Sequence, residues 1–114
     1  MSDYKLIHNP KCSKSRQTLE LLKSKGIEPQ ILLYLEKNLD ESFLKEVFKA
    51  LPNPPAKYLR VKEDDYKNLE NKPETLAEVI AAIKKYPKIL ERPILYHKGH
   101  ARLGRPPENV LEII

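Results

Sequence analysis

The chain has 114 residues, 40% of them hydrophobic, and this length predicts one domain, residues 1–114, with a hydrophobic core of its own. No apolar run is long enough to cross a membrane, and the first residues lack the pattern of a signal peptide, so we expect no membrane partner. The net charge is +5, but the basic residues are spread among acidic ones instead of clustering as in a nucleic-acid footprint, so we expect no nucleic-acid partner and a small anionic substrate.

The first third of the chain predicts a βαβ unit. Residues 4–8 form an apolar stretch typical of a strand, and residues 13–25 carry a helical pattern with Gly26 as its C-terminal cap. Residues 30–35 are a short apolar run, which we interpret as a buried strand. A strand, a helix and a strand in this order favour parallel strands joined by a right-handed crossover.

The middle of the chain predicts helices that are separated by prolines. Asp40 is a candidate N-cap of a helix that ends near Leu51, because apolar residues recur at helical spacing and prolines follow. Residues 58–66 predict one or two short helices. Pro73 suits the first position of a further helix, whose apolar stripe continues until Pro87. We interpret the two longer helices as parts of the core.

The last third predicts a β-hairpin and a short helix. Residues 93–97 and 100–103 are typical of strands, residues 98–99 of the turn between them, and two prolines at residues 106–107 begin a final helix. The predicted order is therefore βαβ, a helical insert, then ββα. This α/β layout is typical of a thioredoxin-like fold, in which the reactive residue lies between the first strand and the first helix.

Cys12, the only cysteine, lies at this predicted junction of strand and helix. Free N–H groups of a first helical turn and the helix dipole favour negative charge there, and Lys11, Lys14 and Arg16 are close in sequence. A lone cysteine is often a buried apolar residue, but these polar and basic neighbours argue against burial. We therefore predict an activated thiolate nucleophile, in the reducing cytoplasm where unpaired thiols persist.

Spacing excludes other cysteine chemistries. A disulfide within the chain needs a second cysteine, and a structural zinc site needs about four ligands, so we expect no metal. Ser15 stands where a Cys-x-x-Cys pair would have its second cysteine. Thr18 stands where the loop of a cysteine phosphatase would have its arginine.

Several motifs match a known family in order and spacing. They are the segment 9–16 (Asn-Pro-Lys-Cys-Ser-Lys-Ser-Arg), Arg60, the segment 92–94 (Arg-Pro-Ile) and the segment 102–108 (Arg-Leu-Gly-Arg-Pro-Pro-Glu). Together they resemble the arsenate reductases that depend on glutathione and glutaredoxin. The likeness covers almost the whole chain.

The resemblance implies roles for particular residues. Cys12 would attack arsenate or a similar oxyanion, His8 would lower the pKa of the thiol, and Ser15 would hydrogen-bond the thiolate. Three guanidinium groups would form the oxyanion site, those of Arg60, Arg92 and Arg105. Glutathione would be the co-substrate and glutaredoxin the protein partner, with no bound cofactor.

The layout also predicts one unusual peptide bond. Thioredoxin-like domains carry a cis-proline at the start of the third strand, facing the active cysteine, and Pro93 occupies that position. We therefore predict a cis bond between Arg92 and Pro93, although only about one X–Pro bond in twenty is cis.

The residues leave alternatives open. Arg60 taken alone is more typical of an ion pair with Glu63 or Asp64, and Arg102 competes with Arg105 for a place in the site. A general glutathione-linked thiol oxidoreductase would use the same cysteine. A redox-sensing transcription regulator that binds RNA polymerase would share the fold but typically carries Cys-x-x-Cys.

Overall fold

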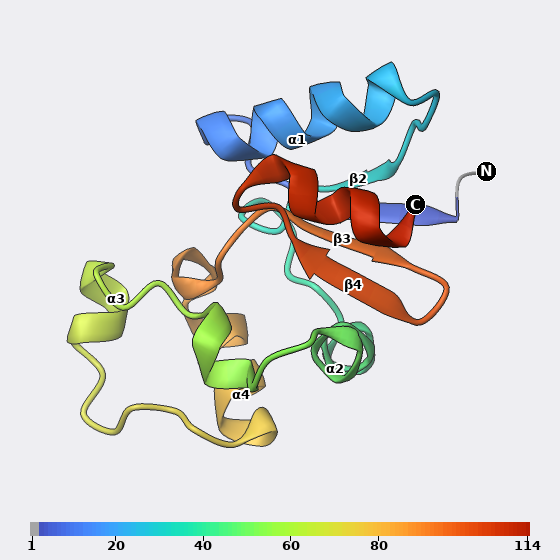
Figure 1. Ribbon diagram of the computed structural model, residues 1–114. Coiled ribbons are helices and arrows are strands. Elements are labelled where there is room, and N and C mark those ends of the chain that lie inside the picture. Colours follow the sequence, from blue (N-terminus) through green and yellow to red (C-terminus); the bar gives the residue numbers. More distant parts are fainter. Residues whose placement is uncertain (1–2) are drawn as a thin grey trace.

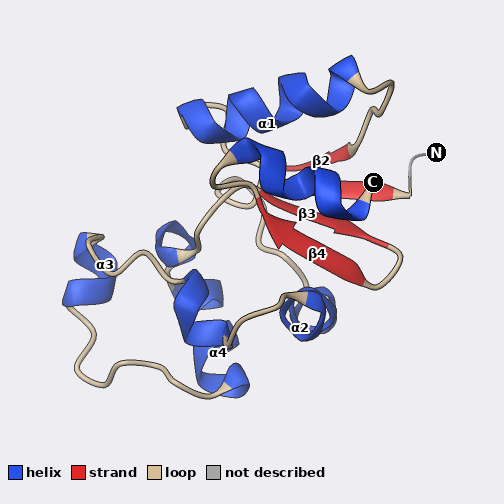
Figure 2. Cartoon of the chain, in the orientation of Figure 1, coloured by secondary structure: helices blue, strands red, loops and turns tan. Residues whose placement is uncertain are grey.

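A computed structural model describes residues 3–114, and in this part of the chain four strands form one mixed sheet (Figures 1 and 2). The strand order is β2-β1-β3-β4. Strand β1 pairs parallel with β2, whereas β1 with β3 and β3 with β4 are antiparallel. The strands are β1 (Tyr4–Ile7), β2 (Gln30–Leu32), β3 (Ile94–His97) and β4 (His100–Leu103).

Helices cover both faces of this sheet (Figure 1). The α-helices are α1 (Ser13–Ser24), α2 (Glu41–Ala50), α3 (Asp64–Lys67) and α4 (Leu76–Lys85), and the 3₁₀ helices are η1 (Pro55–Tyr58), η2 (Pro87–Ile89) and η3 (Pro107–Ile113). Helices α1 and η3 lie side by side on one face, and the insert from α2 to η2 lies on the other side. The predicted order of βαβ, helical insert and ββα is confirmed, with the final helix in 3₁₀ form.

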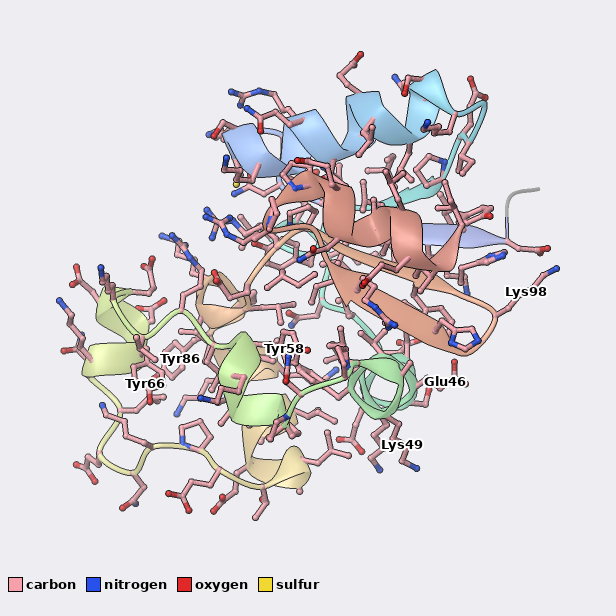
Figure 3. All side chains as sticks on the ribbon, viewed as in Figure 1. Glu46, Lys49, Tyr58, Tyr66, Tyr86 and Lys98 are labelled. Carbon is pink, nitrogen blue, oxygen red and sulfur yellow. The ribbon has the colours of Figure 1, made fainter. Side chains whose placement is uncertain are left out.

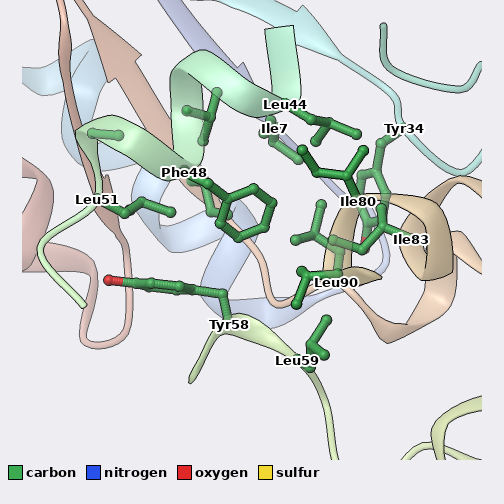
Figure 4. Close-up of a cluster of buried hydrophobic side chains, with 14 of the residues drawn as sticks. Ile7, Tyr34, Leu44, Phe48, Leu51, Tyr58, Leu59, Ile80, Ile83 and Leu90 are labelled. Atoms are coloured by element: carbon green, nitrogen blue, oxygen red, sulfur yellow. The ribbon is translucent and has the colours of Figure 1, made fainter. Parts of the chain in front are cut away.

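Two buried clusters sandwich the sheet, because successive side chains of a strand point to opposite faces. Leu6 on β1 packs with Leu22 and Val110 beneath α1 and η3. Ile7, the next residue, joins the larger cluster that the insert covers, together with Leu44 (Figure 4). The fold is therefore centred on β1, and the chain leaves this strand directly into the loop that carries Cys12.

The second strand differs from its prediction. The run at residues 30–35 was expected to be a buried strand, but β2 ends at Leu32, and Ile31 and Leu35 are 37% and 44% exposed. The reason is its place at the sheet edge, where one side of the strand has no neighbour. After β2 the chain turns, since the N–H groups of Glu36 and Lys37 both donate to the Leu33 carbonyl.

The start of α4 also differs. Pro73 was predicted as the first helical residue, but it is buried in the preceding loop and the helix begins at Leu76. A capping box decides this boundary: the Thr75 hydroxyl accepts from the Glu78 N–H at 3.2 Å, and the Glu78 carboxylate accepts from the Thr75 N–H at 3.0 Å. Between α2 and α4, two short helices overlap the ends of the predicted range 58–66, since η1 ends at Tyr58 and α3 begins at Asp64.

The predicted turns and the cis bond are confirmed. The peptide bond between Arg92 and Pro93 is cis, and the bond between Arg105 and Pro106, which was not predicted, is cis as well. The hairpin turn places Lys98 at a φ of 46°, followed by glycine. Within residues 3–114, no helix combines the length and apolar character that a membrane crossing requires.

Candidate active site

The loop between β1 and α1 holds Cys12 at the N-cap of α1, partly buried. The Asn9 carbonyl accepts the Cys12 N–H at 3.0 Å, and the Asn9 side chain accepts the Lys11 N–H at 3.0 Å. On the outer side, the Arg16 guanidinium donates to the Pro10 carbonyl at 2.9 Å. These bonds tie the loop to itself and to the helix, so the sulfur is held at the first helical turn.

Ser15 and His8 support this loop from beneath. Ser15 is fully buried, and its hydroxyl accepts the Asn9 N–H at 3.0 Å and lies 2.7 Å from Nδ1 of His8. Burial, and secondly the charge of Arg16, lower the pKa of His8 below its ordinary value of 6.5. A neutral imidazole can accept the hydroxyl proton at Nδ1, which completes the network. The Ser15 hydroxyl is thus bonded to His8 and Asn9, and the hydrogen bond from Ser15 to the Cys12 sulfur comes from its backbone N–H.

The Cys12 thiol has a pKa below its ordinary value of 9.0, although burial raises this pKa. The backbone N–H of Ser15, the hydrogen bond and charge of Arg92, and a hydrogen bond from Arg105 act in the other direction and together outweigh burial. The serine therefore does favour the thiolate, through its backbone. His8 contacts the Ser15 hydroxyl, and its predicted effect on the pKa of Cys12 stays a prediction.

Two of the three predicted arginines converge on the sulfur. Nη1 of Arg105 lies 3.8 Å from Sγ of Cys12 and also donates to the Arg92 carbonyl at 3.0 Å. Arg92 favours the thiolate through a hydrogen bond and its charge. The competitor Arg102 turns away, because its Nε bonds Glu112 at 2.9 Å. The structure thus brings Arg105, and not Arg102, to the cysteine.

Arg60 reaches the site from the insert but is paired with carboxylates. Its guanidinium lies 3.3 Å from Glu63, the ion pair considered from the sequence, and 3.5 Å from Glu91. Glu91 also lies 4.0 Å from Nε of Arg105, so it bridges the two arginines. Arg60, Glu91 and Arg105 line a hollow of about 420 Å³. A larger hollow of about 600 Å³ lies along β2 and α2, and none of the predicted site residues lines it.

Two residues of this region were not predicted. Glu91 directly precedes the Arg92–Pro93 motif, and an acidic residue beside an expected anion site was the signal that could have identified it. Tyr34 is the other: its hydroxyl lies close enough to Arg92, Arg60 and Cys12 for their charges to affect its pKa. The one polar group in the apolar run at residues 31–35 was the available signal.

The arrangement suits nucleophilic attack on an anion. A thiolate is the reactive form of cysteine, and guanidinium groups bind tetrahedral oxyanions through paired, charge-assisted hydrogen bonds. Charge that builds up on the oxyanion during attack would be stabilised by the same groups.

Comparison with known proteins identifies relatives over nearly the full length. Residues 7–113 match the family model described as the ArsC family. An arsenate reductase of Haemophilus influenzae is 44% identical over 112 residues, which are 96% of this chain and 97% of the relative. An uncharacterized protein of Escherichia coli, YfgD, is 49% identical over 113 residues, 96% of this chain and 95% of that protein. The solved structure of an arsenate reductase from Vibrio cholerae superposes with a TM-score of 0.88 at 45% identity, covering 97% of both chains.

Proposed function

We propose that this chain, which belongs to the ArsC family, is an arsenate reductase that depends on glutathione and glutaredoxin, acting in the cytoplasm. The observation that carries the proposal is the placement of the Cys12 sulfur 3.8 Å from Arg105, with its pKa lowered by Ser15, Arg92 and Arg105 against the effect of burial. The relatives whose names state arsenate reduction support the substrate.

In the proposed first step, the Cys12 thiolate attacks arsenic of bound arsenate. A sulfur–arsenic bond forms, and one arsenate oxygen leaves as hydroxide, which is released as water after protonation. Arg92 and Arg105 stabilise the charge on the remaining oxygens. Arg60 would join them when the anion replaces the carboxylates of Glu63 and Glu91 as its partner.

In the second step, the thiolate of glutathione attacks the Cys12 sulfur. The sulfur–arsenic bond breaks with its electron pair on arsenic, so arsenic(V) becomes arsenic(III) and leaves as arsenite. Cys12 and glutathione are left as a mixed disulfide, which glutaredoxin clears by thiol–disulfide exchange. The chain has no second cysteine, so an external thiol has to resolve the adduct.

A coupled assay tests this proposal. With arsenate, glutathione, glutaredoxin, glutathione reductase and NADPH, turnover by the protein is expected to make oxidised glutathione, so that glutathione reductase consumes NADPH in an arsenate-dependent way. Cys12→Ser is expected to abolish this NADPH consumption. Without glutaredoxin, intact mass should show one glutathione on the wild-type chain and none on Cys12→Ser.

Other outcomes identify other functions. A protein inert to arsenate that still takes up glutathione from oxidised glutathione would be a general thiol oxidoreductase. A protein that shows no arsenate-dependent turnover, and binds RNA polymerase even as Cys12→Ser, would be a transcription regulator.

A further inference from the structure

The backbone of Tyr34 lies beside the loop that carries Cys12. Strands β1 and β2 are parallel, so the segments that follow them leave the same edge of the sheet. One carbonyl joins the two segments: Leu32 accepts the N–H of His8 at 3.0 Å and the N–H of Tyr34 at 3.1 Å. The tyrosine is therefore placed at the base of the active-site loop by the backbone itself.

The ring of Tyr34 is part of the core, but its hydroxyl has no role there. The residue is 2% exposed and packs in the cluster with Ile80 and Ile83 from α4 (Figure 4). Its hydroxyl is buried and makes no hydrogen bond of ordinary distance and angle among residues 3–114, although the Arg92 guanidinium lies near enough to interact with its oxygen. A donor at that oxygen leaves the hydroxyl proton without an acceptor. A buried hydroxyl without a partner is unfavourable, and phenylalanine would fill the same space without that cost.

The groups around the hydroxyl belong to the proposed anion site. Burial raises the pKa of Tyr34, the charges of Arg92 and Arg60 lower it, the charge of Cys12 raises it and a hydrogen bond from Arg92 lowers it, with the net result above the ordinary value of 10.0. The hydroxyl therefore keeps its proton and remains a donor at any working pH. Nε of Arg92 is likewise buried without a partner in the described part of the chain. Two buried donor groups without an acceptor, the Tyr34 hydroxyl and Nε of Arg92, thus belong to residues that interact electrostatically with Cys12.

We propose that the hydroxyl of Tyr34 donates a hydrogen bond to an oxygen of the tetrahedral oxyanion bound between Cys12 and the arginines. This inference rests on the proposed function and adds a neutral, substrate-binding donor to the site. The bound oxyanion would supply the acceptor that the free protein lacks. A hydrogen bond to a charged oxygen is worth more than one between neutral groups, particularly where water is excluded.

Tyr34→Phe tests the inference in the full chain, with arsenate and, separately, phosphate as the probes. Binding is measured without glutathione, as protection of Cys12 from iodoacetamide at increasing anion concentration. We expect affinity for both anions to fall about tenfold, the usual effect of losing one hydrogen bond to a charged group. Without anion, the iodoacetamide rate is expected to stay at the wild-type value, and resistance to urea to stay equal or rise because an unpartnered hydroxyl is removed.

Tyr58→Phe is the matched control. Tyr58 is equally buried, but its hydroxyl has a partner, since it accepts from the backbone and side chain of Asn53 at 3.2 and 3.3 Å. This variant is expected to lose stability and to bind both anions like the wild type. If the Tyr34 hydroxyl binds the anion, Tyr34→Phe therefore lowers anion affinity without lowering stability, whereas Tyr58→Phe lowers stability without lowering anion affinity.

The outcomes separate the two proposals. If wild type is protected by the anions and Tyr34→Phe is protected equally well, the inference is overturned and the reductase proposal stands. If neither anion protects wild-type Cys12 at any concentration, the oxyanion site itself is refuted, and both proposals fail.

Discussion

Cys12 owes its predicted reactivity to residues that lie far from it in the chain. Only the Ser15 N–H comes from its own helix, whereas Arg92 and Arg105 come from the last quarter of the sequence. Burial opposes the thiolate, so the lowered pKa depends on these three groups together. Arg105 is the most exposed of them and the most readily replaced without disturbing the core.

Arg105→Gln is expected to raise the pKa of Cys12. Because the wild-type pKa is lowered, the thiolate persists as pH falls below 9.0 and is lost only as pH passes through the lower value. Removing one guanidinium moves that midpoint upward, so alkylation at pH 7 becomes slower. The pH profile of the iodoacetamide rate measures the shift.

Arg102→Gln is the control for this experiment. Arg102 lies three residues away but pairs with Glu112, so its removal is expected to leave the profile unchanged. A midpoint that moves equally in both variants would mean that general positive charge, and not the contact at 3.8 Å, sets the pKa.

The sequence predicts a functional residue best when a local pattern of strand and helix indicates where that residue lies in the fold. Cys12 was predicted from its place between a strand and a helix, a local pattern. The partner of the Ser15 hydroxyl could not be predicted, because this hydrogen bond depends on how the buried His8 side chain lies beneath the loop. Glu91 and Tyr34 each carried a weak local signal, but they were missed because contacts across the site define their roles.

At the scale of elements, Gly104 controls how α1 sits against the end of β4. Its N–H donates to the Pro93 carbonyl at 2.8 Å, and a Cβ at this position would lie 2.6 Å from Oγ1 of Thr18 and 2.9 Å from Cγ of Pro93. Thr18 is a buried residue of α1. The glycine therefore allows α1, the helix that Cys12 caps, to pack directly on the two arginine motifs, to which Pro93 and Gly104 belong.

Gly104→Ala is expected to destabilise the protein by about 1–3 kcal/mol, the usual effect of overpacking, as measured by urea unfolding. It should also slow turnover, since moving α1 from Pro93 separates Cys12 from Arg92. Thr18→Ala removes two of the three contacting atoms, so the double variant is expected to lose less stability than the two single effects added together. Strictly additive losses would show that the helix is not held at this contact.

Element boundaries show the same division between local and tertiary information. The order of elements and the helix α1 were predictable from periodicity and capping residues. β2 was overestimated because an apolar run does not reveal whether a strand is central or at an edge, and Leu33 and Leu35 are exposed beyond its end. The start of α4 was misplaced because a proline suits a first turn, yet the capping box of Thr75 and Glu78 places the first helical residue at Leu76, three residues later.

At the scale of the molecule, the proposed site joins two regions that could in principle unfold separately. Cys12 and Arg105 belong to the sheet and its covering helices, whereas Arg60 and its partner Glu63 belong to the insert. Tyr58, Tyr66 and Tyr86 also come from the insert, which projects from the sheet (Figures 1 and 3). One cluster nevertheless contains both Ile94 from the sheet and buried residues of α2 and α4.

This shared cluster leads to a final prediction, that the described part of the chain, residues 3–114, unfolds as one cooperative unit. Separating the insert from the sheet would expose Ile7 and Ile94 together with the insert's own apolar side chains. Partial unfolding would therefore remove the hydrophobic stabilisation of both the sheet and the insert. In hydrogen exchange followed by mass spectrometry, the best-protected amides of α4 and of β3 are expected to open with equal free energies. Saturating phosphate should raise both values by the same amount, since binding requires Arg60 and Cys12 in one structure. If α4 exchanges much faster than β3, and phosphate protects only β3, the insert is a separate unit and Arg60 does not contribute to anion binding.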